Sequence, residues 1–260
     1  MVILGDYHTH TIYSSGKRNS KHATGTILEN ALIAKEKGLT EIAITDHGFS
    51  HKLYGLQRKN LQKMREEIDF AMQKTGVKIY LGVEANIISR DGDIDVNPKD
   101  LESLDMLIVG FHSFAKPKNC KEFFKFFLPN ILGFKRKKDV SRNTLAILKA
   151  MDKYNIDIIS HPGVNMPMDF NEVSKQAQKT NTYLEINGKR IAYTTNDVQT
   201  ILNNNAKFVI DSDAHSPQRV GECSKAVNFA IKNNIPYNAI ANMGNTIKIK
   251  NKKVNKIEFF

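Results

Sequence analysis

Histidine and carboxylate side chains recur at alternate positions near both ends of the sequence. Asp6, His8 and His10 follow a short apolar run in MVILGDYHTH, and Asp213 and His215 do so in KFVIDSDAH. Alternate residues of a β-strand point to the same face, so each set can direct its side chains to one place. Neutral imidazoles and carboxylates are ligands that divalent metals such as zinc prefer. This spacing favours a metal site.

Further histidines and one glutamate stand where other apolar runs end, and one more histidine stands in the loop before the first expected helix. The complete set is His8, His10, His22, His47, Glu84, His112, His161, Asp213 and His215. Among the histidines, only His51 has no such position. A single tetrahedral ion uses four ligands, so a set of this size predicts a centre with more than one metal ion.

Seven short apolar runs place these residues, and segments with helical signals separate the runs. The runs are MVILGDY, EIAITDH, KIYLGVEAN, MLIVGFHS, IDIISHPG, TYLEING and KFVIDSDAH. Strands that alternate with helices indicate an α/β protein with a parallel sheet, and this many repeats favour a closed barrel over an open sheet. The functional groups of such barrels lie where strands end and loops begin, which is where the set stands.

Local signals predict several helix boundaries. Thr26 and Glu29 form a capping box at the start of TILENALIAKEKG. Ser216 and Pro217 predict the first residues of a helix over SPQRVGECSKAVNFAIKNN.

The segment 120–138, CKEFFKFFLPNILGFKRKK, interleaves phenylalanines with lysines. We expect a helix pair, divided at Pro129, that buries its phenylalanines against the barrel wall. A lid over the site and a surface that stacks on nucleic-acid bases are the alternatives.

Composition predicts one domain over residues 1–260, because 260 residues with 41% hydrophobic content can build one large core. No signal peptide or membrane-spanning stretch is readable, and the two cysteines show no paired spacing, so we expect a cytoplasmic protein without a membrane partner. The net charge of +11 suits anionic partners, although lysines are spread along the whole chain as on ordinary solvated surfaces.

Six motifs, DYHTHT, ITDHG, GVEAN, GFHS, ISHPG and DSDAH, occur in this order along nearly the whole chain. In this respect the sequence resembles the PHP (polymerase and histidinol phosphatase) domain family, and within it the stand-alone, YcdX-like phosphoesterases. The resemblance implies a distorted, TIM-like (β/α)7 barrel with three divalent metal ions and phosphoesterase activity.

The resemblance also implies a division of the ligands. His8, His10, Glu84 and Asp213 would hold one ion, Glu84 would bridge to a second ion held by His112 and His161, and the third would take His22, His47 and His215. The loop before His22, TIYSSGKRNSK, is longer than in the subgroup, so a binuclear centre is the alternative if His22 is not a ligand. We expect this basic loop to lie on the surface.

The chemistry that such a centre implies is hydrolysis of a phosphate ester by metal-bound hydroxide. Asp213 or His215 could protonate the leaving group, although metal binding would compromise either role. Arg190 first, then Asn187, Lys189 and Arg219, are the predicted substrate-binding residues, because phosphate needs cationic or N–H donors. Asp6, Asp46 and Asp211 are candidates for orienting the imidazoles.

The sequence therefore favours a phosphomonoesterase acting on a small phosphorylated substrate, with zinc as the expected metal and manganese or iron as alternatives. A nuclease or polymerase-associated module acting on nucleic acid is less favoured, because no polymerase region is attached. A histidinol-phosphate phosphatase is a narrower form of the first reading. A non-catalytic binding module is disfavoured by the unbroken ligand set. The oligomeric state is left open.

Overall fold

A computed structural model describes residues 2–15 and 22–250 of the chain. Seven parallel strands form one sheet whose spatial order is the order of the sequence. The strands are β1 (Gly5–Thr9), β2 (Glu41–Ile44), β3 (Lys78–Asn86), β4 (Met106–Gly110), β5 (Ile158–Ile159), β6 (Tyr183–Asn187) and β7 (Phe208–Asp211). Each of the seven predicted apolar runs overlaps one of them, which confirms the distorted seven-stranded α/β barrel.

The barrel is nearly closed at the seam between β1 and β7. Thr9 and Ala214 form an isolated parallel bridge there. Across the same seam, the Tyr7 N–H donates to the carboxylate of Asp211 at 2.7 Å. A side chain thus takes the place of a backbone carbonyl where the ladder of hydrogen bonds is incomplete.

Asp6 also forms hydrogen bonds at this seam. Its side chain does not point the same way as that of His8, although strict alternation along a strand predicts that it should. Its carboxylate accepts the N–H groups of Ser212 at 3.0 Å and Gly221 at 2.8 Å. The pairing of β1 with β2 shifts register between Asp6 and Thr9, so the period of two is interrupted at this point. The prediction that Asp6 points into the site is wrong for this reason.

The strands carry two apolar layers, one inside the barrel and one between the strands and the helices. The inner cluster is made of Tyr7, Ala43, Tyr80, Met106, Ile108, Ile158, Val209, Ile247 and Ile249. Ile247 and Ile249 come from the segment after the last helix and fill the barrel from the end opposite to the strand termini that carry the histidines. The larger outer cluster packs strand residues against the helices.

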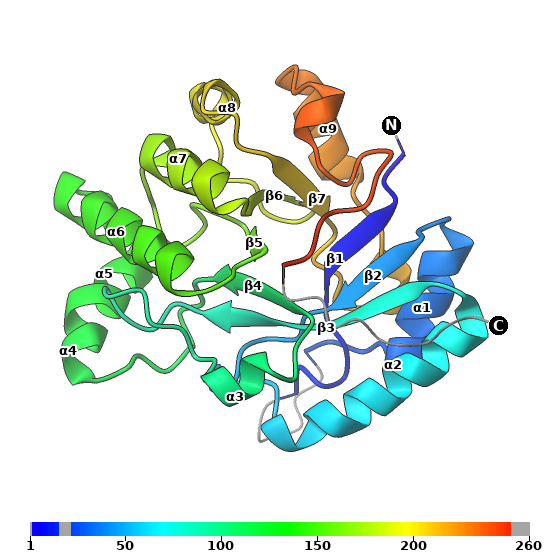
Figure 1. Cartoon of the computed structure of the whole chain (residues 1–260). Helices are drawn as coiled ribbons and strands as arrows, with labels where there is room; N and C mark the ends of the chain where they lie inside the picture. The colour runs from blue at the N-terminus through cyan, green and yellow to red at the C-terminus, as the bar shows by residue number, and fades with distance from the viewer. Residues whose placement is uncertain (1, 16–21, 251–260) are drawn as a thin grey trace.

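Helices surround the strands on the outside (Figure 1). They are α1 (Ile27–Glu36), α2 (Leu61–Thr75), α3 (Pro98–Leu101), α4 (Cys120–Glu122), α5 (Leu128–Ile131), α6 (Lys137–Lys153), α7 (Phe170–Thr180), α8 (Thr195–Asn203) and α9 (Ser224–Lys232). Thr26 and Glu29 form the predicted capping box of α1. Within the described residues, no helix has the length and apolar character needed to cross a membrane.

The helix predicted to begin at Ser216 is divided in two. Pro217–Arg219 form a short 3₁₀ helix, η3, whereas α9 begins only at Ser224. Gly221 lies between them with φ +69°, a conformation that ends helical geometry. Pro217 does occupy the first position of its short helix, as predicted.

The segment 120–138 folds as α4, a π-helical turn η2 (Phe123–Phe127) and α5, without a break at Pro129. Of its phenylalanines, Phe126 and Phe127 are buried, whereas Phe124 is 64% exposed. Phe123 and Phe134 are each 37% exposed. The expected burial against the barrel therefore holds for only part of the segment.

Two glycines with the same backbone conformation allow a matched test of packing. Gly76, which ends α2, and Gly92 in the loop after β3 both have φ +74°. A Cβ at Gly76 would meet nothing within 4 Å, whereas a Cβ at Gly92 would lie 2.5 Å from the backbone nitrogen of Ala150 in α6. The loop is thus pressed against a helix backbone that cannot yield easily.

We predict that Gly76→Ala lowers the free energy of unfolding by about 1 kcal/mol, the cost of the left-handed conformation. Gly92→Ala is expected to cost about 3 kcal/mol, because steric overlap is added to the same conformational cost. Urea denaturation followed by circular dichroism measures both. Equal losses for the two variants would contradict the close packing of this loop.

Candidate metal centre

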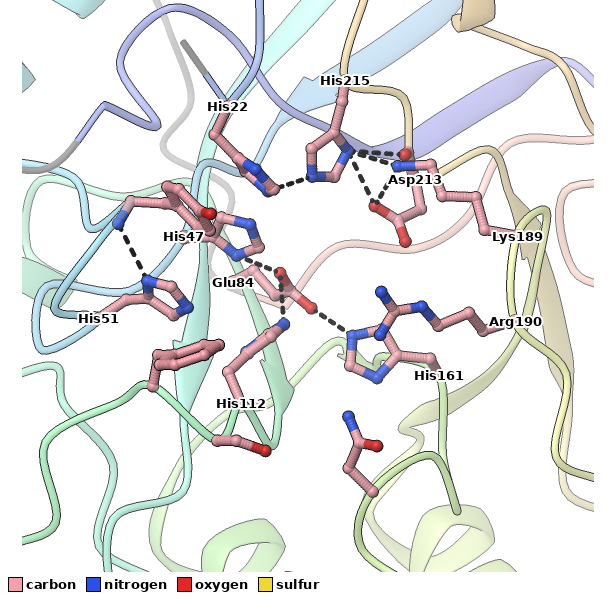
Figure 2. A pocket seen from close by; sticks show the side chains of 14 residues that line it. His22, His47, His51, Glu84, His112, His161, Lys189, Arg190, Asp213 and His215 are labelled. Carbon is pink, nitrogen blue, oxygen red and sulfur yellow. Dashed lines mark hydrogen bonds and ion pairs between the residues drawn. The ribbon is translucent and has the colours of Figure 1, made fainter. Parts of the chain in front are cut away.

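The predicted ligands gather where the carboxyl ends of the strands meet, around one cavity of about 380 Å³. The cavity is lined by His22, His47, His51, Tyr54, Glu84, His112, Ser113, Phe114, His161, Asn165, Lys189, Arg190, Asp213 and His215. His8 and His10 lie beside these residues and are fully buried. All nine residues of the predicted set are therefore brought together, and Figure 2 shows the seven of them that line the cavity, without His8 and His10.

Glu84, at the end of β3, lies in the middle of the group. Its Oε1 is 2.9 Å from His161 Nε2, and its Oε2 is 3.0 Å from His47 Nδ1. The same Oε2 lies 3.4 Å from His8 Nε2 and 3.5 Å from His112 Nε2. One carboxylate is thus shared by imidazoles from four different strands or strand ends, the position expected of a bridging ligand.

Asp213, just after β7, lies close to two more imidazoles, those of His8 in β1 and His10 just after it. Its Oδ1 lies 3.5 Å from His10 Nε2 and 3.9 Å from His8 Nε2. The two imidazoles place their Nε2 atoms 3.2 Å apart. The three ligand atoms lie within 4.8 Å of one another, close enough for one ion.

His22 and His215 form the third part of the group, with their Nε2 atoms 2.9 Å apart. Residues 16–21 of the longer loop before His22 lie outside the described residues, so the surface position expected for that loop is not described. His47 and His10 link this part to the others, because His10, His47 and His215 form one possible ion site and His47, Glu84 and His112 form another. His47 therefore belongs to two candidate ion sites, whereas the family resemblance implied one.

Two of the imidazoles, those of His8 and His112, have the ring nitrogen that faces away from the cavity held by an oxygen atom. His8 Nδ1 lies 2.7 Å from a carboxylate oxygen of Glu185, and His112 Nδ1 lies 2.8 Å from the side-chain oxygen of Asn86. Because these oxygens accept hydrogen bonds, each Nδ1 carries the proton and each Nε2 presents a lone pair to the cavity. This is the arrangement in which an imidazole binds a metal.

His10 is oriented in a similar way through an intermediate hydroxyl. Its Nδ1 lies 3.3 Å from Ser14 Oγ, and Ser14 donates to Asp46 at 2.6 Å. Asp46 thus supports an imidazole as the sequence suggested, although only through Ser14. Asp6 and Asp211 instead hold backbone N–H groups at the barrel seam.

Burial keeps several of these imidazoles neutral. Desolvation, with the neighbouring His215, lowers the pKa of His22 to about 3. Desolvation likewise lowers the pKa of His215 to about 4, although Asp213 acts in the opposite direction. The pKa values of His10 and His112 also lie well below the usual range, again chiefly because of burial. Neutral imidazoles are the form that can coordinate a cation.

His8 differs from these imidazoles, because nearby carboxylates favour its protonated form. Burial acts to lower its pKa, but the carboxylates of Glu185, Glu84 and Asp213 raise it well above the usual range. Buried carboxylates this close to one another need a cation. A proton on His8 is one source of that charge, and a metal ion is another.

Some buried ligand atoms have no hydrogen-bond partner among the described residues. They include both ring nitrogens of His47, Glu84 Oε2 and His161 Nδ1. Unsatisfied buried polar atoms are costly, and native proteins retain few of them without a functional reason. Each neutral imidazole keeps a lone pair on one ring nitrogen, and such lone pairs beside Glu84 Oε2 fit divalent cations as their partners.

The sequence missed three supporting residues. Glu185 and Asn86 contact imidazoles directly, and Asp95 accepts the side-chain N–H of Asn86 at 2.7 Å. Glu185 stands two residues before Asn187 at the end of the sixth apolar run, so the same alternation that drew attention to Asp213 marks it. Asn86 carries the same mark, two residues after Glu84 at the end of the third apolar run, whereas Asp95 gives no comparable signal, because only the folded loop brings it to Asn86.

The four predicted substrate-binding residues have different positions. Lys189 and Arg190 line the cavity, and Lys189 Nζ lies 3.3 Å from Asp213 Oδ1. Asn187 is buried beneath them, where its side-chain oxygen accepts the backbone N–H groups of both residues. Arg219 is exposed on η3 and is not among the residues that line the cavity.

Comparison with known proteins agrees with this geometry. A model of the PHP domain matches residues 6–196. A probable phosphatase of Caldanaerobacter subterraneus subsp. tengcongensis is 33% identical, over 91% of this chain and 86% of that protein. A probable phosphatase of Photobacterium profundum is 30% identical, over 92% of this chain and 89% of that protein.

A solved structure supports the fold. Histidinol phosphate phosphatase from Lactococcus lactis, complexed with zinc, L-histidinol and phosphate, has a TM-score of 0.58 and 15% sequence identity, covering 95% of this chain and 98% of that one. At that identity the likeness concerns the barrel alone. The family match covers most of the chain and the relatives cover nearly all of it, so the chain belongs to the PHP domain family.

Proposed function

We propose that this protein hydrolyses phosphate monoesters of small molecules with three divalent metal ions. The chain is a phosphoesterase of the hydrolase class, which is the activity named for its relatives of about the same length. One observation carries the finer proposal. Several buried imidazole and carboxylate atoms have no hydrogen-bond partner among the described residues. They gather at a cavity that the cations Lys189 and Arg190 also line.

Three ions are proposed because the ligand atoms fall into three adjacent groups. Glu84 lies between the imidazoles of His161 and His112, Asp213 lies beside those of His8 and His10, and His22 faces His215 with His47 nearby. Divalent ions in such a site supply an activated water and neutralise the phosphoryl oxygens. Zinc is the proposed metal, and the imidazole-rich ligands also suit manganese or iron.

Lys189 and Arg190 are proposed to bind the phosphate. The backbone N–H groups of both residues donate to the side-chain oxygen of Asn187. These hydrogen bonds fix the loop that carries the two side chains. Figure 2 shows the two side chains on the same side of the cavity, across from His22 and His51. Arg190 can bind two phosphate oxygens at once, whereas Lys189 provides a single positive charge.

The charge states argue against Asp213 and His215 as the general acid that the sequence suggested. Although burial acts to raise the pKa of Asp213, the nearby His8 and His10 hold it well below its usual range. With the pKa of His215 lowered to about 4, neither group carries a proton at neutral pH. Lys189 lies beside both of them, and we propose that its ammonium group neutralises charge on the phosphate.

We predict that chelated protein loses turnover of an aryl phosphate monoester and regains it when Zn, Mn or Fe is restored. His112→Ala should lower kcat by about 100-fold or more at saturating metal, because one ligand beside Glu84 is lost. The matching diester is the comparison substrate, measured under the same conditions. Cleavage of the diester alone would instead favour a nuclease, the alternative that suits the positive net charge.

The number of ions gives a separate prediction. Wild-type protein is expected to retain three divalent ions per chain after gel filtration, and His22→Ala should retain two, because His22 faces His215 in the third part of the group. Inductively coupled plasma mass spectrometry counts the ions. Two ions in the wild type, unchanged in His22→Ala, would show a binuclear centre.

Glu185→Gln tests how the imidazoles are oriented. One carboxylate oxygen accepts a hydrogen bond from His8 Nδ1, and the other accepts one from the backbone N–H of His161. The amide of glutamine has only one acceptor oxygen and no negative charge, so it cannot replace both bonds. We expect metal affinity to fall by about 10-fold to 100-fold with little change in the far-ultraviolet circular dichroism spectrum. Glu172→Gln on the exposed side of α7 is the control, and equal affinity in the two variants would refute the role of Glu185.

A further inference from the structure

Beside the ligand cluster, the cavity has a wall of rings that the proposed hydrolysis does not use. Phe114 and Tyr54 line it together with His51, the one histidine left out of the predicted ligand set. The rings of His51 and Tyr54 are stacked at 5.1 Å with 20° between their planes, and the ring of Phe114 meets His51 edge-on at 6.3 Å. Tyr54 in turn stacks on His22 at 3.7 Å.

Phe114 is the unusual member of this wall. Its side chain is 56% exposed although it lies at a polar, metal-binding cavity. Its backbone is nevertheless fixed, since the Phe114 carbonyl accepts the Lys52 N–H at 3.0 Å and the next residue, Ala115, donates to the His112 carbonyl at 3.0 Å. A large apolar ring presented to solvent from a fixed backbone is available to a ligand without further ordering.

His51 contributes a hydrogen-bond donor to the same wall. Its Nδ1 accepts the Tyr54 N–H at 3.0 Å, so in the neutral ring the proton is on Nε2. Figure 2 shows the ring directed toward the interior of the cavity, on the side away from Lys189 and Arg190. The wall therefore offers two apolar ring faces and one N–H donor. The carboxylates that line the cavity, Glu84 and Asp213, are not part of it.

We propose that this wall, made of Phe114, Tyr54 and His51, binds the leaving group of the substrate, and that the preferred substrates are phosphate monoesters carrying a planar ring. The inference rests on the proposed monoesterase function. With the phosphate on the side of Lys189 and Arg190, a leaving group directed across the cavity would meet this wall. Aromatic side chains bind planar rings by stacking or edge contacts, in which a polyol gains little.

The test compares two substrates in the metal-loaded protein, phenyl phosphate and glycerol 2-phosphate. Phe114→Ala should lower kcat/KM for phenyl phosphate about 5-fold or more, mainly through KM, and change that for glycerol 2-phosphate by less than about 2-fold. Phe114→Tyr should retain wild-type values. Phe124→Ala is the matched control, since that ring is 64% exposed but is not among the residues lining the cavity.

Binding provides a second readout that does not require turnover. Calorimetry should show that the wild type binds phenylphosphonate more tightly than methylphosphonate, and that Phe114→Ala removes most of this difference. An equal loss with both substrates, or no preference between the phosphonates, would overturn the proposal. If the wild type hydrolyses neither ester, the monoesterase function fails, while the two phosphonates still decide whether the wall binds rings.

Discussion

The structure depends on holding together groups that repel one another. Glu84, Asp213 and Glu185 are buried carboxylates, and the lone pairs of His8, His10 and His112 point toward the first two of them. In a poorly polarisable interior such an arrangement is unfavourable until positive charge enters it. The barrel holds these groups in place. Its strands carry the ligands, and parallel pairing and apolar layers on both faces fix the strands. Two of the ligands also have a strained backbone, since His161 and Asp213 have φ values of 29° and 53°.

The support behind the imidazoles decides what the site can bind. If Nδ1 of His8 were free, the ring could turn or change tautomer, and its Nε2 would no longer be committed to the cavity. Glu185 prevents this, and it also holds the backbone of His161 on the neighbouring strand end. Asn86 does the same for His112 with the help of Asp95. Of these positioning residues, Asn86 lies within the motif GVEAN, whereas Glu185 and Asp95 lie outside all six motifs.

Much of the fold and of the ligand set could be predicted because both depend on local periodicity. Apolar runs followed by polar residues marked the strand ends, where His47, Glu84 and His112 were found. Prediction failed where long-range packing overrides a local pattern. Asp6 alternates with His8 in sequence, yet the register shift in β1 turns it to the seam. Ser216 and Pro217 start only a short turn, because Gly221 intervenes before α9. Phe124 reads as a buried helix residue and is exposed, since neither composition nor spacing says which face of so short a helix meets the barrel.

Metal binding at the seam between β1 and β7 requires that the first and the last strand have both folded. His8 comes from the first strand and Asp213 follows the last, so their shared site exists only after the two edges of the sheet have met. A chain that lacks its final strand, whether partly synthesised or partly unfolded, holds fragments of the ligand set but cannot complete it. Ions that bind only the closed barrel stabilise it by mass action. A metal-free chain would lack this stabilisation where the first and last strands meet.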